Sequence, residues 1–123
     1  MMSENGKTGL RRRTLDFGLR VIRMYSALPK SAEAQVVGKQ ALRCGTSVGA
    51  QYREAFRARS RAEFASKMQS ALQELEETSY WLELLEEAGI VKSQRLALLR
   101  QETDELTAIF VASVKTARKA REA

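Results

Sequence analysis

Lysine and arginine side chains recur at a helical spacing between residues 39 and 57. On a wheel that advances about 100° per residue, four cations fall opposite an apolar arc, and two more arginines follow in the next turn of chain. Cations presented along one helix face can follow a phosphate backbone and release its counterions on binding. The pattern therefore predicts a surface that binds the backbone of RNA or DNA. Its candidate residues are Lys39, Arg43, Arg53, Arg57, Arg59 and Arg61.

A shorter basic run lies near the N-terminus, among glycines and small polar residues. We expect residues 1–13 to form a flexible basic arm. In that arm Arg11, Arg12 and Arg13 would assist the stripe on the helix, although three consecutive cations are also typical of a solvated tail.

The stripe has other interpretations that charge alone leaves open. Its cations could face water only, or pair with the glutamates of residues 74–87. They could also dock an acidic protein, which would make the chain a protein–protein adaptor, for example for a polymerase-like enzyme, with no intrinsic nucleic-acid binding. A purely structural oligomer is a third possibility. Aromatic residues do not alternate with the cations, so base stacking is not indicated.

The residue types that are missing limit catalysis. The sequence has no histidine and one cysteine, Cys44. Serine–histidine and cysteine–histidine nucleophiles, imidazole–metal sites and cysteine-rich metal sites are therefore ruled out. Glu76, Glu83 and Glu87 could in principle perform acid–base chemistry, but their spacing is that of a solvated helix face. We expect no enzyme activity, no cofactor and no metal, and we expect Cys44 to behave as a small buried apolar residue.

Composition indicates one folded domain. The chain has 123 residues, of which 44% are apolar, enough for a core. No apolar run approaches the length of about 18 residues that a membrane span requires, and the N-terminus does not read as a secretory signal. A lone cysteine fits a reducing cytoplasm. Residues 1–61 hold 13 Lys and Arg against 4 Asp and Glu, whereas residues 62–123 hold 8 against 11.

The strongest structural signal is a long amphipathic segment from Ser60 to Glu87. Large apolar residues recur there every three or four positions, which predicts one face of a helix. Ser60 and Glu63 form a capping box at its start, and Gly89 supplies a stop because glycine enters the left-handed conformation without steric cost. A helix this long cannot bury its stripe alone, so the other segments must pack along it.

Three further helices are predicted around this one. The first starts near Thr14, ends before Pro29 and carries a broad apolar arc that includes Leu15, Leu19 and Ile22. The second runs from a cap at Ser31 to about Ala58, with glycines that permit close packing, and the last is capped by Ser93. Together they predict an all-α domain, an antiparallel up-down four-helix bundle over residues 14–121.

Several aromatic and apolar residues lie off these stripes and predict contacts between copies of the chain. The alternative is that the first helix and the loops of the same chain cover them. The candidate interface residues are Tyr52, Phe56, Tyr80, Trp81 and Leu84.

Three motifs carry a resemblance to a known family. They are the run Ser47–Ala55, the segment Ser60–Phe64 that reads S-x-x-E-F, and Glu77–Leu82 that reads E-x-x-Y-W-L. In this combination they resemble the 23S ribosomal RNA intervening-sequence proteins, and the similarity extends over about residues 15–119. One departure is that Gln51 stands where the family pattern has asparagine.

The resemblance implies an up-down bundle that assembles as a homopentamer with a basic surface or channel. Members of the family are similar to the accessory protein of diversity-generating retroelements, which binds nucleic acid and a reverse transcriptase. Nucleic acid, a second copy of the chain and a reverse transcriptase or other protein are thus the expected partners, and no membrane is expected.

Overall fold

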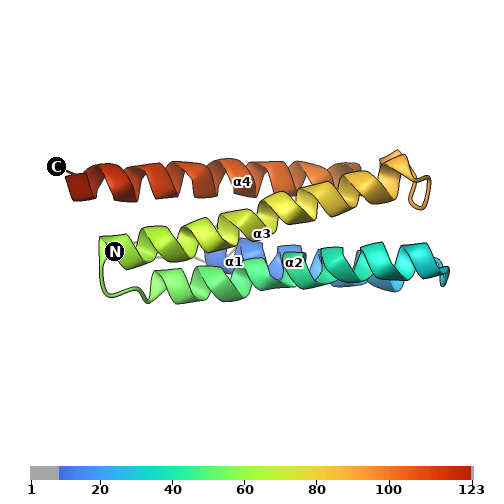
Figure 1. Ribbon diagram of the computed structural model, residues 1–123, viewed down its shortest axis with the longest axis horizontal. Coiled ribbons are helices and arrows are strands. Elements are labelled where there is room, and N and C mark those ends of the chain that lie inside the picture. The colour runs from blue at the N-terminus through green and yellow to red at the C-terminus, as the bar shows by residue number, and fades with distance from the viewer. Residues whose placement is uncertain (1–8, 123) are drawn as a thin grey trace.

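Short turns divide the chain into four helices, and these form the predicted up-down antiparallel bundle (Figure 1). The computed structural model describes residues 9–122, apart from the side chains of 120–122. The helices are α1 (Leu10–Ser26), α2 (Ala32–Phe56), α3 (Arg61–Glu87) and α4 (Ser93–Glu122). None of them is both long and apolar enough to cross a membrane.

The predicted capping residues set the bounds of α2 and α3. The Ser31 hydroxyl accepts a hydrogen bond from the Ala34 amide, and the Ser60 hydroxyl accepts one from the Glu63 amide at 3.1 Å. The Glu63 carboxylate reaches back to the amide of Arg59 at 2.7 Å, one residue before the cap. Gly89 follows α3 with φ of +73°, the left-handed conformation that was predicted for it.

The start of α1 differs from the prediction. The helix begins at Leu10, four residues before Thr14, so the expectation of a flexible arm is wrong for residues 10–13, and residues 1–8 lie outside the described chain. Gly9 occupies the cap position without a side chain to mark it. The Thr14 hydroxyl bonds the Leu10 carbonyl within the helix at 2.7 Å instead of capping it. Arg11, Arg12 and Arg13 therefore project from the first turn of a helix.

The core is continuous along the bundle and includes a residue that was assigned to an interface. Tyr52 is only 1% exposed, and its ring lies 6.0 Å from that of Phe110 and 6.1 Å from that of Phe56. The prediction that Tyr52 contacts a second copy is therefore wrong, because α4 of the same chain covers it. Phe56 is half-buried against the same core.

Glycines of α2 let α1 approach closely. A Cβ atom added to Gly45 would lie 2.7 Å from Cγ2 of Val21, and one added to Gly49 would lie 3.3 Å from Oγ1 of Thr14. Helices packed this closely leave no room for a larger side chain at the crossing. As a result α1 packs along α2 and meets α4 over a short stretch only.

This crossing predicts a large effect of one substitution. Gly45→Leu should lower the free energy of unfolding by about 1–3 kcal/mol, because the new side chain overlaps the buried Val21. Ala50→Leu, at an exposed position of the same helix, is the matched control and should change stability by less than about 0.5 kcal/mol. Urea unfolding followed by circular dichroism measures both, and equal effects would contradict a close crossing at Gly45.

Candidate nucleic-acid interface

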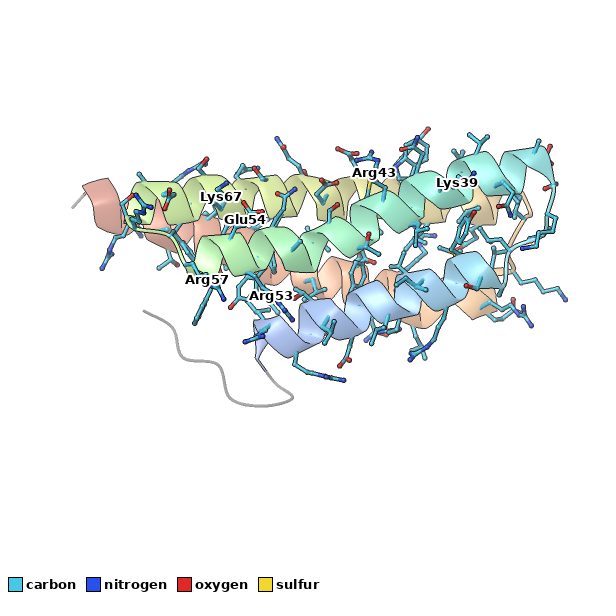
Figure 2. The ribbon with its side chains drawn as sticks, turned by 90° about the horizontal axis from the view of Figure 1, so that it is seen from below. Lys39, Arg43, Arg53, Glu54, Arg57 and Lys67 are labelled. Atoms are coloured by element: carbon cyan, nitrogen blue, oxygen red, sulfur yellow. The ribbon has the colours of Figure 1, made fainter. Side chains whose placement is uncertain are left out.

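The predicted cations lie on the solvent-facing side of α2 and on the turn that follows it. Lys39, Arg43, Arg53 and Arg57 are all exposed. In Figure 2, Lys39 and Arg43 lie toward one end of α2, whereas Arg53 and Arg57 lie at the other end, near the start of α1. Arg59, in the turn, and Arg61, the first residue of α3, are exposed as well. All six of these cations are therefore open to solvent.

Glu54 is the carboxylate nearest in sequence to Arg53 and Arg57, but it pairs with neither of them. Glu54 lies between Arg53 and Arg57 in the chain, but its Oε1 pairs with Nζ of Lys67 on α3 at 2.9 Å. Figure 2 shows this pair between α2 and α3, with the two arginines on the other side of α2. The Lys67–Glu54 hydrogen bond raises the pKa of Lys67. Glu54 is thereby held toward α3 and away from the arginines.

Arg43 is the exception in the stripe. Its Nη2 lies 3.8 Å from Oε1 of Glu77 on α3, with the two side chains 60% and 53% exposed. An exposed pair at this distance contributes at most about 1 kcal/mol and is screened by salt. Among residues 9–119, no carboxylate lies within ion-pair distance of the other five cations, Lys39, Arg53, Arg57, Arg59 and Arg61.

The first turn of α1 adds one cation to this surface. Arg11 lines a hollow of about 270 Å³ together with Arg53 and Arg57, over the rings of Tyr52 and Phe56. Arginines of α1 and α2 therefore line the same hollow at one end of the bundle. The sequence placed Arg11 in an arm and could not show this arrangement.

The two neighbouring arginines have other contacts. Arg12 pairs with Asp16 one turn along, at 3.0 Å, and both side chains are about half exposed. Arg13 bridges α1 to α4: its Nη2 lies 2.7 Å from Oε1 of Glu102 and 3.2 Å from Oε1 of Glu105. The Glu102 hydrogen bond raises the pKa of Arg13 above its ordinary value. Arg13 thus links α1 to α4 by ion pairs.

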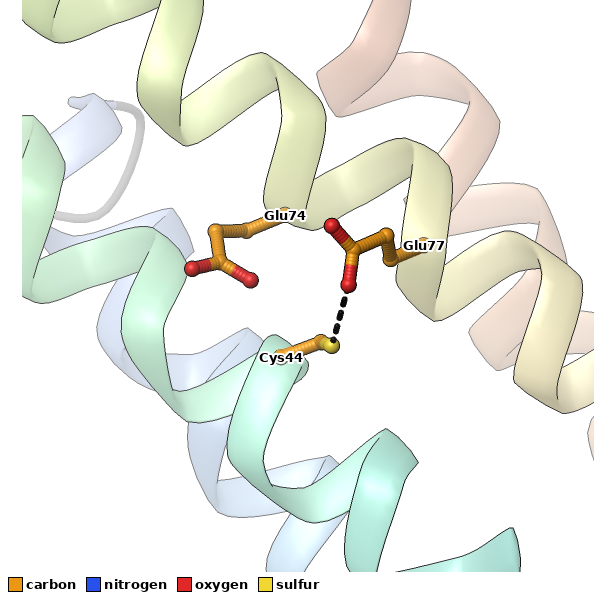
Figure 3. Close-up of side chains that lie close together, drawn as sticks. All are labelled: Cys44, Glu74 and Glu77. Carbon is orange, nitrogen blue, oxygen red and sulfur yellow. Dashed lines mark hydrogen bonds between the residues drawn. The ribbon is translucent and has the colours of Figure 1, made fainter.

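A second cluster, which sequence reasoning missed, lies between α2 and α3. Sγ of Cys44 and one carboxylate oxygen each of Glu74 and Glu77 lie within 4.8 Å of one another (Figure 3). The Cys44 thiol donates to Oε1 of Glu77 at 3.4 Å. Burial, with a smaller effect of this bond, raises the pKa of Cys44 to about 12. Metal binding and nucleophilic attack require the thiolate. Because the Cys44 thiol stays protonated, its contact with Glu77 is best explained as a hydrogen bond that joins α2 to α3.

Gln51, which replaces the family asparagine, lies in the same seam. Its Nε2 donates to Oε2 of Glu74 at 3.2 Å and so links α2 to α3. Oε1 of Gln51 and Oε1 of Glu74 are buried and accept no hydrogen bond from the described chain. The longer glutamine side chain therefore still reaches the neighbouring helix.

The remaining candidate interface residues form a ridge on α3. Tyr80 is 55% exposed and its ring makes an edge contact with that of Trp81, 5.0 Å away between centroids. Trp81 and Leu84 are half-buried. Tyr80 is the member of this set that the described chain leaves most open.

Comparisons with known proteins support the fold and identify the family. A family model described as 23S rRNA-intervening sequence protein matches residues 8–112. The chain is also similar to the crystal structure of a protein with unknown function from the S23 ribosomal protein family of Bacteroides thetaiotaomicron. The identity is 35% and the TM-score 0.80, over 85% of this chain and 97% of that one. No curated protein matches the chain.

The raised pKa of Cys44 predicts slow chemical modification. At pH 8 the native thiol should hold roughly 10³-fold less thiolate than the unfolded thiol, whose pKa lies near 9.0. Iodoacetamide should therefore modify it far more slowly in buffer than in urea, and the rate should rise with pH toward 12. Glu77→Gln should keep most of this protection, because burial is the larger cause. Equal rates in buffer and urea would contradict a buried thiol.

Arg13 and Arg12 offer a matched pair for stability. Arg13→Ala should lower the free energy of unfolding by about 1–3 kcal/mol, because Glu102 would keep a largely buried carboxylate without its partner. Arg12→Ala removes the same charge from an exposed pair and should cost about 0.5 kcal/mol or less. Thermal unfolding measures both, and equal losses would argue against a bridging role for Arg13.

Proposed function

Since the chain belongs to the 23S rRNA-intervening sequence protein family, we propose that it is a non-catalytic protein that binds the backbone of RNA or DNA. The contact surface in this proposal is the outer face of α2 with the α2–α3 turn. Binding would occur in the cytoplasm and would have little sequence preference, because phosphate contacts carry no base information.

The observation that carries this proposal is the exposure of the cations without carboxylate partners. Of the six predicted cations, only Arg43 has a carboxylate within ion-pair distance in the described chain. A cation that is already free of protein carboxylates gives up no ion pair when it meets a phosphate. The free energy of counterion release is then available to binding.

The length of the surface also suits a polyanion. Lys39 and Arg57 are 18 residues apart on one helix, which is about 27 Å at roughly 1.5 Å per residue. The turn arginines extend the charge beyond the helix, and Arg11 widens it at the same end. We therefore include Arg11 in the contact set and leave out Arg13, whose charge serves Glu102 and Glu105.

Assembly of several copies would strengthen a weak site of this kind. The resemblance implies a homopentamer, and the exposed Tyr80 beside Trp81 supports a contact between copies on α3. In a closed ring the same basic face repeats around an axis, so one nucleic-acid chain could engage several copies at once.

The test is a double charge reversal at the end of the stripe. Arg53→Glu with Arg57→Glu should weaken binding of a single-stranded RNA at least tenfold at about 50 mM salt. It should also reduce the slope of log affinity against log salt by about 1.4, since each single-strand phosphate contact contributes about 0.7. Lys92→Glu with Arg95→Glu makes the same change of net charge at exposed positions near the α3–α4 turn, at the other end of the bundle (Figure 1), and should leave the slope unchanged.

Fluorescence anisotropy at several salt concentrations, with RNA and with DNA, supplies the measurement. Equal losses in the two double variants would mean that net charge alone governs binding. Absence of binding by the wild-type protein at low salt would reject the proposal in favour of an adaptor, in which the same cations dock an acidic protein such as a reverse transcriptase.

A further inference from the structure

A second basic surface lies on the opposite flank of α1, away from the stripe on α2. It is a groove of about 750 Å³ between the C-terminal half of α1, the α3–α4 turn and the first turns of α4. Its apolar lining includes Met24, Leu28, Ile90, Val91 and Leu98. The groove exists because α1 follows the glycine face of α2 and meets α4 over a short stretch only.

Four cations surround this apolar floor. They are Arg20, Arg23, Lys92 and Arg95, and in the described chain none of them has a carboxylate within ion-pair distance. Within the groove, Leu98 is 72% exposed, the largest exposure of any large apolar side chain described. A leucine this exposed in a groove that cations also line costs free energy that a bound apolar group would recover.

We propose that this groove binds an acidic amphipathic helix of another protein. The proposal is independent of nucleic-acid binding by α2, since it uses none of the same residues. An apolar stripe on the guest would cover Leu98, Met24 and Val91, and glutamates or aspartates beside the stripe would face the four cations. Recognition would follow the helix-in-groove mode, in which anchors at i, i+3 or i+4, and i+7 enter an apolar channel.

The dimensions of the groove fit such a guest. Its wall on α1 runs from Arg20 to Ala27, the residue that caps the helix, about 10.5 Å at roughly 1.5 Å per residue. Anchors at i and i+7 of a helix are about 10.5 Å apart on the same scale. Two turns of a single helix therefore match the length of this wall.

Other occupants fit less well. A nucleic acid would satisfy the cations but leave the apolar floor without an apolar partner. A second copy placed face to face would bring the four cations against the same four cations. A second copy that presents the Tyr80 face of α3 is the remaining occupant, and the mass of the Leu98→Glu variant described below tests it.

The experiment uses a fluorescein-labelled 14-residue peptide with leucines at i, i+4 and i+7, glutamates beside them and alanines elsewhere. Its comparison peptides carry lysine in place of every glutamate, or one proline in the middle. The full-length protein should bind the acidic peptide at least tenfold more tightly than either comparison peptide in fluorescence anisotropy. Equal binding of the acidic and lysine peptides would overturn the proposal, as would the absence of binding by the acidic peptide.

Two variants localise the site with the same change of charge. Leu98→Glu places a carboxylate in the groove and should weaken the acidic peptide at least tenfold. Ala97→Glu lies next to it, is also exposed and faces away from the groove, so it should change binding less than twofold. Equal effects of the two substitutions would overturn the proposal.

Two further readouts separate this site from the other surfaces. Leu98→Glu should leave the salt slope of RNA binding unchanged, and the Arg53→Glu with Arg57→Glu variant should bind the acidic peptide like the wild type. The mass from light scattering should be the same for Leu98→Glu and the wild type. A smaller mass for Leu98→Glu would mean that a second copy fills the groove and would overturn the proposal.

Discussion

The close approach of α1 to α2 is the packing constraint on which the rest of the structure depends. Gly38, Gly45 and Gly49 form the α2 side of this contact, and added Cβ atoms would meet Leu28, Val21 and Thr14. α1 and α4 contact each other less than α1 and α2 do, and the Arg13–Glu102 ion pair joins them at one end of α1. The groove between α1 and α4 lies beyond that pair, at the other end of α1.

Acidic and basic side chains are separated between the two halves of the chain, and several of the carboxylates are held in contacts between α2 and α3. Glu74 and Glu77 of α3 turn toward α2, where they meet Gln51, Cys44 and Arg43. Lys67 of α3 takes Glu54 of α2 in the same seam. Each of these contacts stays between α2 and α3, so the acidic half of the chain reaches only the edge of the basic face. Arg43, at that edge, pairs with Glu77. The other five cations of the surface have no carboxylate within ion-pair distance in the described chain.

Helix number, order and most bounds could be predicted from the sequence, because Ser31, Ser60 and Gly89 act locally. The start of α1 could not, because Gly9 caps it without a side chain and a basic run resembles a tail. The exposure of the cations on α2 could be predicted from their helical spacing.

Helical spacing predicts which residues share a face of a helix, but it does not predict what that face packs against. The face of α1 that carries Leu15 and Ile22 is as apolar as the buried face, yet these side chains are 40% and 44% exposed. Burial of Tyr52 depends on Phe110 of α4, which no local signal connects to it. The Cys44–Glu77 contact could have been found, since two antiparallel helices joined at Arg59–Ser60 bring these residues to the same level.

The two basic surfaces show that positive charge alone does not define a ligand. In the middle of α2 the positions between the cations are Thr46 and Ala50, which are small and exposed, so this part of the surface offers charge and little apolar area. A phosphate backbone needs nothing more, because its binding free energy comes mainly from released counterions. Between α1 and α4 the cations instead surround leucine, isoleucine, valine and methionine side chains. A polyanion would leave that floor in water, whereas a helix with apolar and acidic faces would satisfy both the floor and its rim. The residues between the cations, more than the cations themselves, therefore distinguish the partner that each surface fits.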